Sequence, residues 1–208
     1  MDRKRLAEVF SAISKTMDEN REYLIELDQQ NGDGDLGISM SSGFRAVRLY
    51  LEQAEETDLG KLFMKGAAVF NEAAPSSLGT ILSLGMMGMA RRLKGMESAD
   101  FPEMNAALDQ GLRLLMEKAG SRPGEKTILD ALCPAVQTLL ENEDKPAAQA
   151  YGLAAAAAAE GSEATRQMKP VHGRAVYYGE KGIGLLDGGS VAGKLMIEAI
   201  ARHLGGIG

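Results

Sequence analysis

The 208-residue sequence has no tryptophan, one cysteine and two histidines, and aromatic residues make up only 5% of it. With a single cysteine, Cys133, no internal disulfide can form and a zinc cluster is disfavoured. The net charge is -6 and the pI is near 5.1. A nucleic-acid groove needs clustered basic residues and stacking rings, so this composition argues against a nucleic-acid partner.

The chain also lacks long apolar runs. No window approaches the length needed to span a bilayer, and the first 20 residues lack the apolar stretch and cleavage site of a signal peptide. We therefore expect a cytoplasmic protein that has no membrane partner. No break between the predicted elements is long enough to be a linker, so we predict one domain over residues 1–208.

Apolar residues recur at helical spacing along most of the chain, and alternating strand patterns are almost absent. Breaks fall at glycine- and proline-containing segments. The pattern predicts an all-α protein of eight amphipathic helices, at about residues 6–27, 38–56, 59–73, 77–94, 102–119, 125–142, 146–168 and 189–204.

An acidic, glycine-rich stretch, LDQQNGDGDLGISM at residues 27–40, lies between the first two predicted helices. Asp33 and Asp35 can point the same way from an extended turn, and Asp28 can fold back toward them. Three carboxylates this close repel one another unless a cation lies between them. Hard oxygen ligands without histidine or cysteine favour magnesium or calcium.

Two other interpretations of this stretch are possible. An EF-hand calcium loop fits Asn31, Asp33 and Asp35, but its sixth position is Leu36 instead of glycine and its twelfth is Ser42 instead of glutamate. A solvated acidic turn that caps the next helix is the simpler alternative.

The segment GSRPGEKT, residues 120–127, superficially resembles a phosphate-binding P-loop. The interpretation fails because Glu125 separates the glycine from Lys126, and because a helix follows without a preceding strand. Thr127 is better explained as a residue that caps or packs against that helix.

Four segments in one order carry a family resemblance. The spacing Asp28-x4-Asp33-x-Asp35-x-Gly37 resembles the metal-binding corner of the L subunit of dihydroxyacetone kinase, which is also the C-terminal nucleotide-binding domain of single-chain kinases. Three further segments are similar to family segments: RPGEKTILDALCPA (122–135), AAAAAEGSEATRQM (155–168), and residues 173–190, which begin with Gly-Arg-Ala and end in YYGEKGIGLLDGGS.

The resemblance implies a single-domain barrel of about eight antiparallel helices that binds ADP or ATP at its mouth through Mg²⁺. Asp28, Asp33 and Asp35 would hold the metal, and Arg174 would meet a phosphate in the catalytic site, although a salt bridge from Arg174 to Glu160 or Glu180 is the alternative. The other residues expected at the nucleotide are Leu36, Gly37, Ile38, Ser39, Ala73, Ala74, Ser76, Ser77, Gly120, Ile128, Asp187, Gly188 and Gly189.

The implied activity is that of a kinase or phosphotransferase subunit that passes phosphate to dihydroxyacetone or a related small ketose or polyol. In the family that acceptor is held by a separate K subunit, which this chain does not resemble. The other implied partners are a phosphodonor protein of the phosphotransferase system and a second copy of the chain.

The sequence departs from the family pattern at a few positions. Leu36 and Ser39 replace the usual histidine and asparagine, Ala74 lies where serine is expected, and Gly188 replaces proline. Ser76 or Ser77 can substitute for that serine. These changes motivate an alternative, a non-catalytic nucleotide-binding or regulatory module of the same fold.

Overall fold

A computed structural model describes residues 1–206, which form nine α-helices and two short 3-10 segments; among these residues there is no strand, only an isolated bridge between Asp2 and Ser98. In chain order the elements are α1 (Arg3–Glu19), α2 (Arg21–Gln29), α3 (Leu36–Gln53), α4 (Leu59–Ala73), α5 (Ser77–Arg92), α6 (Phe101–Ala119), α7 (Leu129–Glu141), α8 (Ala147–Ala164), η1 (Thr165–Gln167), η2 (Arg174–Gly182) and α9 (Gly188–Leu204).

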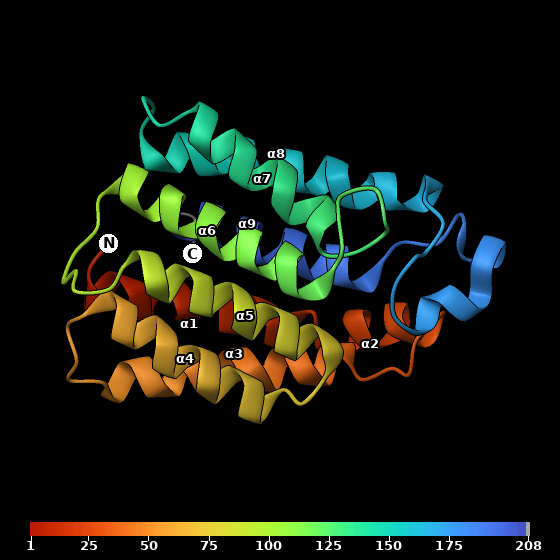
Figure 1. Cartoon of the computed structure of the whole chain (residues 1–208), viewed down its shortest axis with the longest axis horizontal. Coiled ribbons are helices and arrows are strands. Elements are labelled where there is room, and N and C mark those ends of the chain that lie inside the picture. The colour runs from red at the N-terminus through yellow and green to blue at the C-terminus, as the bar shows by residue number, and fades with distance from the viewer. Residues whose placement is uncertain (207–208) are drawn as a thin grey trace.

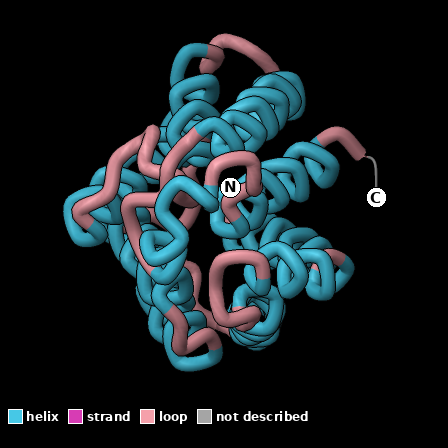
Figure 2. Tube along the Cα trace, turned by 90° about the vertical axis from the view of Figure 1, so that its right-hand side faces the viewer, coloured by secondary structure: helices cyan, strands magenta, loops and turns pink. Residues whose placement is uncertain are grey.

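Eight of the helices form a closed ring. Each of α3 to α8 packs against the next helix in the chain, and α1 packs against both α3 and α9, which closes the circle. Figure 1 shows the helices side by side, most of them joined by short connections and α8 joined to α9 by a long one, and Figure 2 shows them from one end. The predicted all-helical barrel is therefore confirmed.

The first predicted helix, residues 6–27, is wrong in one respect, because the structure divides it at Asn20. The backbone of Asn20 leaves the helical region (φ -102°, ψ 11°), and its side-chain amide donates to the Thr16 carbonyl at 2.8 Å. The helix therefore ends and a new one, α2, begins at Arg21. Helix α2 packs against α3 and α9 outside the ring, so the barrel wall still consists of eight helices, which we call its staves.

Two further boundaries differ from the prediction. The helix expected from residue 125 begins at Leu129, because the Asp130 carboxylate accepts bonds from the amides of Gly124 (2.5 Å) and Thr127 (2.7 Å) and folds the preceding residues into a turn. The helix expected to reach residue 168 ends at Ala164 and continues as η1. The segment expected to be a loop contains the short helix η2.

The connections fall into two groups, one at each end of the barrel. We call the end that carries residues 28–39, 73–77, 120–128 and 165–189 the site end, because the predicted site residues lie in these four segments. Helices α3, α5, α7 and α9 all begin there (Figure 1). The other end, which we call the opposite end, carries residues 54–58, 93–100 and 142–146.

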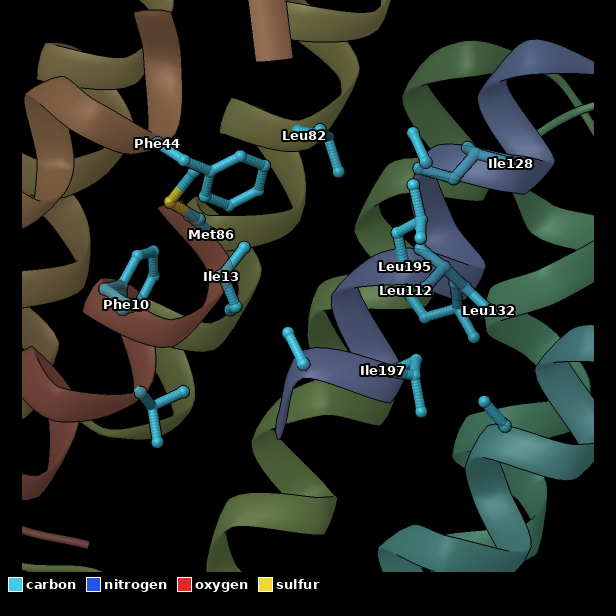
Figure 3. Close-up of a cluster of buried hydrophobic side chains, with 14 of the residues drawn as sticks. Phe10, Ile13, Phe44, Leu82, Met86, Leu112, Ile128, Leu132, Leu195 and Ile197 are labelled. Atoms are coloured by element: carbon cyan, nitrogen blue, oxygen red, sulfur yellow. The ribbon is translucent and has the colours of Figure 1, made fainter. Parts of the chain in front are cut away.

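The barrel interior is apolar. Side chains such as Phe10, Phe44, Met86, Leu112 and Leu132 point inward from different staves (Figure 3), and they line a cavity of about 150 Å³. The predominance of apolar residues on the inner helix faces explains why the helical period in the sequence is easy to detect. None of the described helices has both the length and the apolar character that a membrane span needs.

Candidate functional site

Three carboxylates meet at the site end. Asp28 lies in the last turn of α2, and Asp33 and Asp35 lie in the turn that leads into α3. One carboxylate oxygen of each residue lies within 4.8 Å of those of the other two. The structure therefore brings together the residues that the sequence predicted as a cluster.

Asp28 organises the turn that carries the other two. Its Oδ2 accepts bonds from the amides of Gly34 (2.8 Å) and Asp35 (3.0 Å), with a longer one from Leu36 at 3.4 Å. A β-carbon on Gly32 would lie 2.1 Å from Asp28 Oδ1, so the turn can wrap this closely around the carboxylate only with glycine at that position.

The electrostatics of the cluster favour a cation. Burial, followed by the negative charges of Asp33 and Asp28, raises the pKa of the Asp35 carboxyl above its usual range. Asp35 precedes α3, but its side chain makes no capping bond to the helix. Its carboxylate is therefore available to a ligand, and an all-oxygen set of this kind suits Mg²⁺ or Ca²⁺.

Arg174 reaches the cluster from a different part of the chain. Its guanidinium pairs with Asp33 Oδ2 at 2.7 Å, and the salt-bridge partners considered from the sequence, Glu160 and Glu180, are not the ones it contacts. Residues 168–187, which we call the 168–187 loop, therefore fold back over the turn that carries the aspartates. The Arg174 side chain is 69% exposed, so it remains accessible to a ligand.

Asp187 ends the same loop and caps α9. Its Oδ2 accepts from the Ser190 amide at 2.6 Å. Burial raises its pKa to about 7; the bond from Ser190 and the positive charge of Lys126 oppose the rise, whereas the charges of Asp130 and Asp28 add to it. The next residue, Gly188, lies against the Leu36 side chain and near Leu27, so Asp187 lies close to the turn that carries the acidic cluster.

The remaining predicted residues lie around this centre. Ser76 caps α5 by accepting from the Gly79 amide at 3.1 Å, whereas Ser77 is exposed and Ala74 is buried. A β-carbon on Gly189 would lie 3.5 Å from the amide of Ile128, which places those two residues side by side. The structure places Ala73 at the end of α4 and Gly120 at the end of α6, both at the site end.

Two positions that depart from the family pattern contact each other. Leu36 is only 7% exposed, and its side chain lies so close to Gly188 that a β-carbon there would be 2.6 Å from Leu36 Cδ2. Ser39 is equally buried, whereas Ile38 is exposed. The Leu36 side chain therefore presents no polar group to a ligand, and the Ser39 amide is already bonded to the Asp35 carbonyl at 2.9 Å.

Sequence reasoning missed the polar residues that hold the loops of the site end. Asp130 is 4% exposed and fixes the turn before α7, and Thr165 is fully buried between α8 and Asp187. Both lie in segments whose pattern is that of ordinary helix. An aspartate in the first turns of the helix predicted at 125–142, shortly after Gly120 and Gly124, was the one available signal.

Comparison with known proteins agrees with this architecture. The sequence pattern of the DAK2 domain matches residues 30–202, and the chain belongs to the DAK2 domain family. Over 208 residues it is 27% identical to "PEP-dependent dihydroxyacetone kinase 2, ADP-binding subunit DhaL" of Listeria innocua, covering 98% of this chain and 96% of that protein. The resemblance found in the sequence is thereby confirmed.

Longer proteins contain a similar region. The chain is 31% identical over 205 residues to human "Triokinase/FMN cyclase", covering 97% of this chain but 35% of that protein. It superposes on the dihydroxyacetone kinase of C. freundii crystallised with AMP-PNP and Mg²⁺, with a TM-score of 0.76 and 26% identity, covering 94% of this chain and 33% of that one. The chain thus spans about a third of these longer relatives.

Proposed function

We propose that this protein is the nucleotide-binding subunit of a dihydroxyacetone kinase-type system. It binds ADP or ATP with Mg²⁺ at the site end and takes part in phosphoryl transfer to dihydroxyacetone or a related small ketose or polyol. The observation that carries the proposal is the convergence of Asp28, Asp33, Asp35 and Arg174, from two distant segments, at one end of a DAK2 barrel.

Each residue has a role that its geometry supports. The three carboxylates would hold Mg²⁺, which would supply positive charge to offset the negative charge that develops during phosphoryl transfer. Arg174, released from Asp33, binds phosphate oxygens through its guanidinium fork. The first turn of α3 offers main-chain amides and the positive end of the helix dipole to the same phosphates.

The 73–77 segment, Gly120, Ile128 and residues 187–189 form the rest of the nucleotide site in this proposal. Ile128 is buried at the start of α7, beside Gly189, so in this proposal it supports the segment that would flank the base or ribose. Ser77 is the exposed hydroxyl of its segment, since Ser76 is engaged in capping α5.

The acceptor requires a partner. The Listeria relative is named as the ADP-binding subunit of a PEP-dependent kinase, which implies that other subunits supply the remaining functions. We propose that a K-type subunit holds the ketose and that a phosphodonor protein recharges the nucleotide when ADP remains bound. A cytoplasmic location fits these partners.

A second candidate is a nucleotide-binding or regulatory module that has lost transfer. The observation in its favour is the buried Leu36 side chain, which packs toward Gly188 instead of presenting a polar group to the phosphates. The two candidates agree on nucleotide binding and differ only in turnover.

Calorimetry with MgADP and a coupled assay for phosphorylated triose, with a K-type subunit and phosphodonor proteins present, test both candidates. Asp33→Asn should weaken Mg²⁺-dependent ADP binding at least about tenfold, because it removes a ligand charge. Asp109→Asn is the matched control: it breaks an Arg–Asp pair of the same 2.7 Å length on α6. Unchanged affinity in Asp33→Asn would reject the metal assignment, and MgADP binding without turnover would select the second candidate.

A further inference from the structure

Lys126 is a buried cation that the proposed chemistry does not use. Lys126 is only 4% exposed. Its φ of 61° is the one positive φ of a non-glycine residue within residues 1–206. A lysine held in the left-handed region costs free energy that other contacts must offset, and such residues concentrate at functional sites. Its contacts are therefore informative.

The Lys126 ammonium joins two segments that are distant in sequence. Nζ donates to the carbonyl of Thr165 at 2.5 Å and to the carbonyl of Leu185 at 2.6 Å. Thr165 is the residue at the C-terminal end of α8, where the helix dipole favours a positive charge. Leu185 lies two residues before Asp187, at the end of the 168–187 loop.

Neighbouring bonds secure the same end of the loop. Arg166 donates to the Gly184 carbonyl at 2.9 Å, and the Gly184 amide donates to the Arg166 carbonyl at 2.7 Å. The Asp187 amide donates to Thr165 Oγ1 at 3.1 Å. Residues 184–187 are thus fixed to the end of α8 by several bonds, of which Lys126 supplies the buried charge.

The residue before Lys126 holds the other end of the loop. The Glu125 carbonyl accepts from the Val171 amide at 3.4 Å, and its carboxylate pairs with His172 Nε2 at 2.5 Å. Two adjacent residues of one short turn therefore anchor both ends of a loop whose middle carries Arg174.

Lys126 does not itself contact the acidic cluster. It is connected to the proposed site through the 168–187 loop, which carries Arg174. Arg174 meets Asp33 only if the 168–187 loop folds back over the acidic turn. Without an anchor at residues 184–185, the exposed segment around Tyr177, which is 90% exposed, has little apolar burial to hold it.

We propose that Lys126 is a positioning residue which, together with Arg166, holds residues 184–185 against α8 so that Arg174 and Asp187 keep their places at the acidic cluster. This inference rests on the proposed function for its effect on nucleotide affinity, but not for its effect on the loop. A ligand that contacts the loop would also stabilise its folded-back position.

The test compares Lys126→Met, which keeps the length of the side chain and removes its charge, with wild type. Trypsin can cut the loop after Arg174 and Lys181, both exposed. We expect loop cleavage of the free protein to become about tenfold faster, with the far-UV circular dichroism of the barrel unchanged. Lys118→Met, on the exposed face of α6, is the matched control and should behave as wild type.

A second measurement separates positioning from a general loss of stability. Saturating MgADP should return loop cleavage of Lys126→Met to the wild-type rate, because a ligand that binds the closed form restores it by mass action. The affinity for MgADP should fall about tenfold, since the competent form of the loop is then less populated. Wild-type loop cleavage in Lys126→Met, or accelerated cleavage throughout the barrel, would overturn the inference.

If Lys126→Met does not fold, Arg166→Met tests the same proposal. Its side chain is 39% exposed and donates to the same loop end, so the barrel should tolerate the change. Loop cleavage should accelerate in this variant too. A wild-type cleavage rate would contradict the proposal that Lys126 and Arg166 hold residues 184–185 in place. If wild-type protein fails to bind MgADP, the proposed function fails, whereas cleavage of the free variants still decides the role of Lys126.

Discussion

The two ends of the barrel use the same residue type in different ways. At the opposite end, Asp58 caps α4 by accepting from the Lys61 amide and also accepts from the Gly95 amide, and Asp100 forms a reciprocal capping box with Glu103. At the site end, Asp35 precedes α3 without capping it and lies beside two other carboxylates. The aspartates at the opposite end act as caps, whereas at the site end Asp187 caps α9 but Asp35 makes no capping bond and is left available for a ligand.

The comparison shows that aspartates at the start of a helix do not by themselves indicate a ligand-binding site. The feature that distinguishes the site end is convergence: carboxylates that repel one another, with an arginine from a distant loop drawn onto them. The repulsion between these carboxylates lowers the stability of the folded protein. Substitutions at the two ends should therefore have opposite effects, on ligand binding at the site end and on stability at the opposite end.

The largest expected effect comes from exchanging one aspartate at each end for alanine. Asp35→Ala should weaken MgADP binding about 100-fold, about 3 kcal/mol, and should not lower the melting temperature, because it relieves repulsion and removes no cap. Asp100→Ala should leave binding unchanged and cost about 1 kcal/mol of stability. Calorimetry and thermal melts of both variants measure the pair; equal stability losses would remove the distinction between the ends.

A pH effect of about 2 kcal/mol on stability is expected from Asp187. Its folded-state pKa, about 7, lies above the ordinary value of 3.8, so its contribution to stability is complete below about pH 4 and is lost as the pH rises through 7. The difference between these two pKa values sets a ceiling of about 4 kcal/mol, which partial exposure reduces.

Asp187→Asn keeps an oxygen that can accept from Ser190 but cannot titrate. Urea unfolding without nucleotide, at pH 5 and pH 8, should show wild type losing more stability than the variant across this range. Parallel curves for the two proteins would show that burial does not raise the Asp187 pKa.

The contact between Leu36 and Gly188 should appear as coupling between two substitutions. Gly188→Ala is expected to cost about 1 to 2 kcal/mol, because the new methyl group meets Leu36 Cδ2. In a Leu36→Ala background the same change should cost much less, since the space is then available. Denaturant unfolding of the four proteins measures the coupling, and additive costs would show that the two residues do not share that space.

The smallest predicted effect concerns Arg174→Lys, which keeps the charge and removes the planar fork. Affinity for MgADP should fall about tenfold or less, about 1 kcal/mol, if the guanidinium binds phosphate. The equivalent change at the other 2.7 Å arginine–aspartate pair, Arg113→Lys, should have no effect on binding. An unchanged affinity in Arg174→Lys would mean that its pairing with Asp33 is only a surface salt bridge.

The sequence was sufficient to predict the barrel staves and the acidic turn, because both depend on local patterns. Helical spacing of apolar residues defines the staves, and the three aspartates lie within eight residues of one another. The break at Asn20 was not predicted, because apolar spacing continues through it from Met17 to Leu24 while the backbone turns.

Contacts between distant segments could not be derived from local sequence patterns, and only the family resemblance placed Arg174 and Asp33 in one site. Arg174 and Asp33 are 141 residues apart, as the difference between their numbers shows, and nothing local in either segment specifies their meeting. Lys126 looked like part of a failed phosphate-binding motif, yet its partners are carbonyl groups, which every residue possesses. Side-chain patterns carry no information about such bonds.

The hollow interior gives the barrel a mechanical property as well as an architecture. The apolar cavity of about 150 Å³ is only partly enclosed, and unfolding under hydrostatic pressure is favoured in proportion to the internal volume that it eliminates, which is at most part of that space. The ring of helices should therefore give way to pressure more readily than a solid bundle of similar thermal stability. Filling the space beside Leu112 or Leu132 with larger side chains would make the protein less compressible.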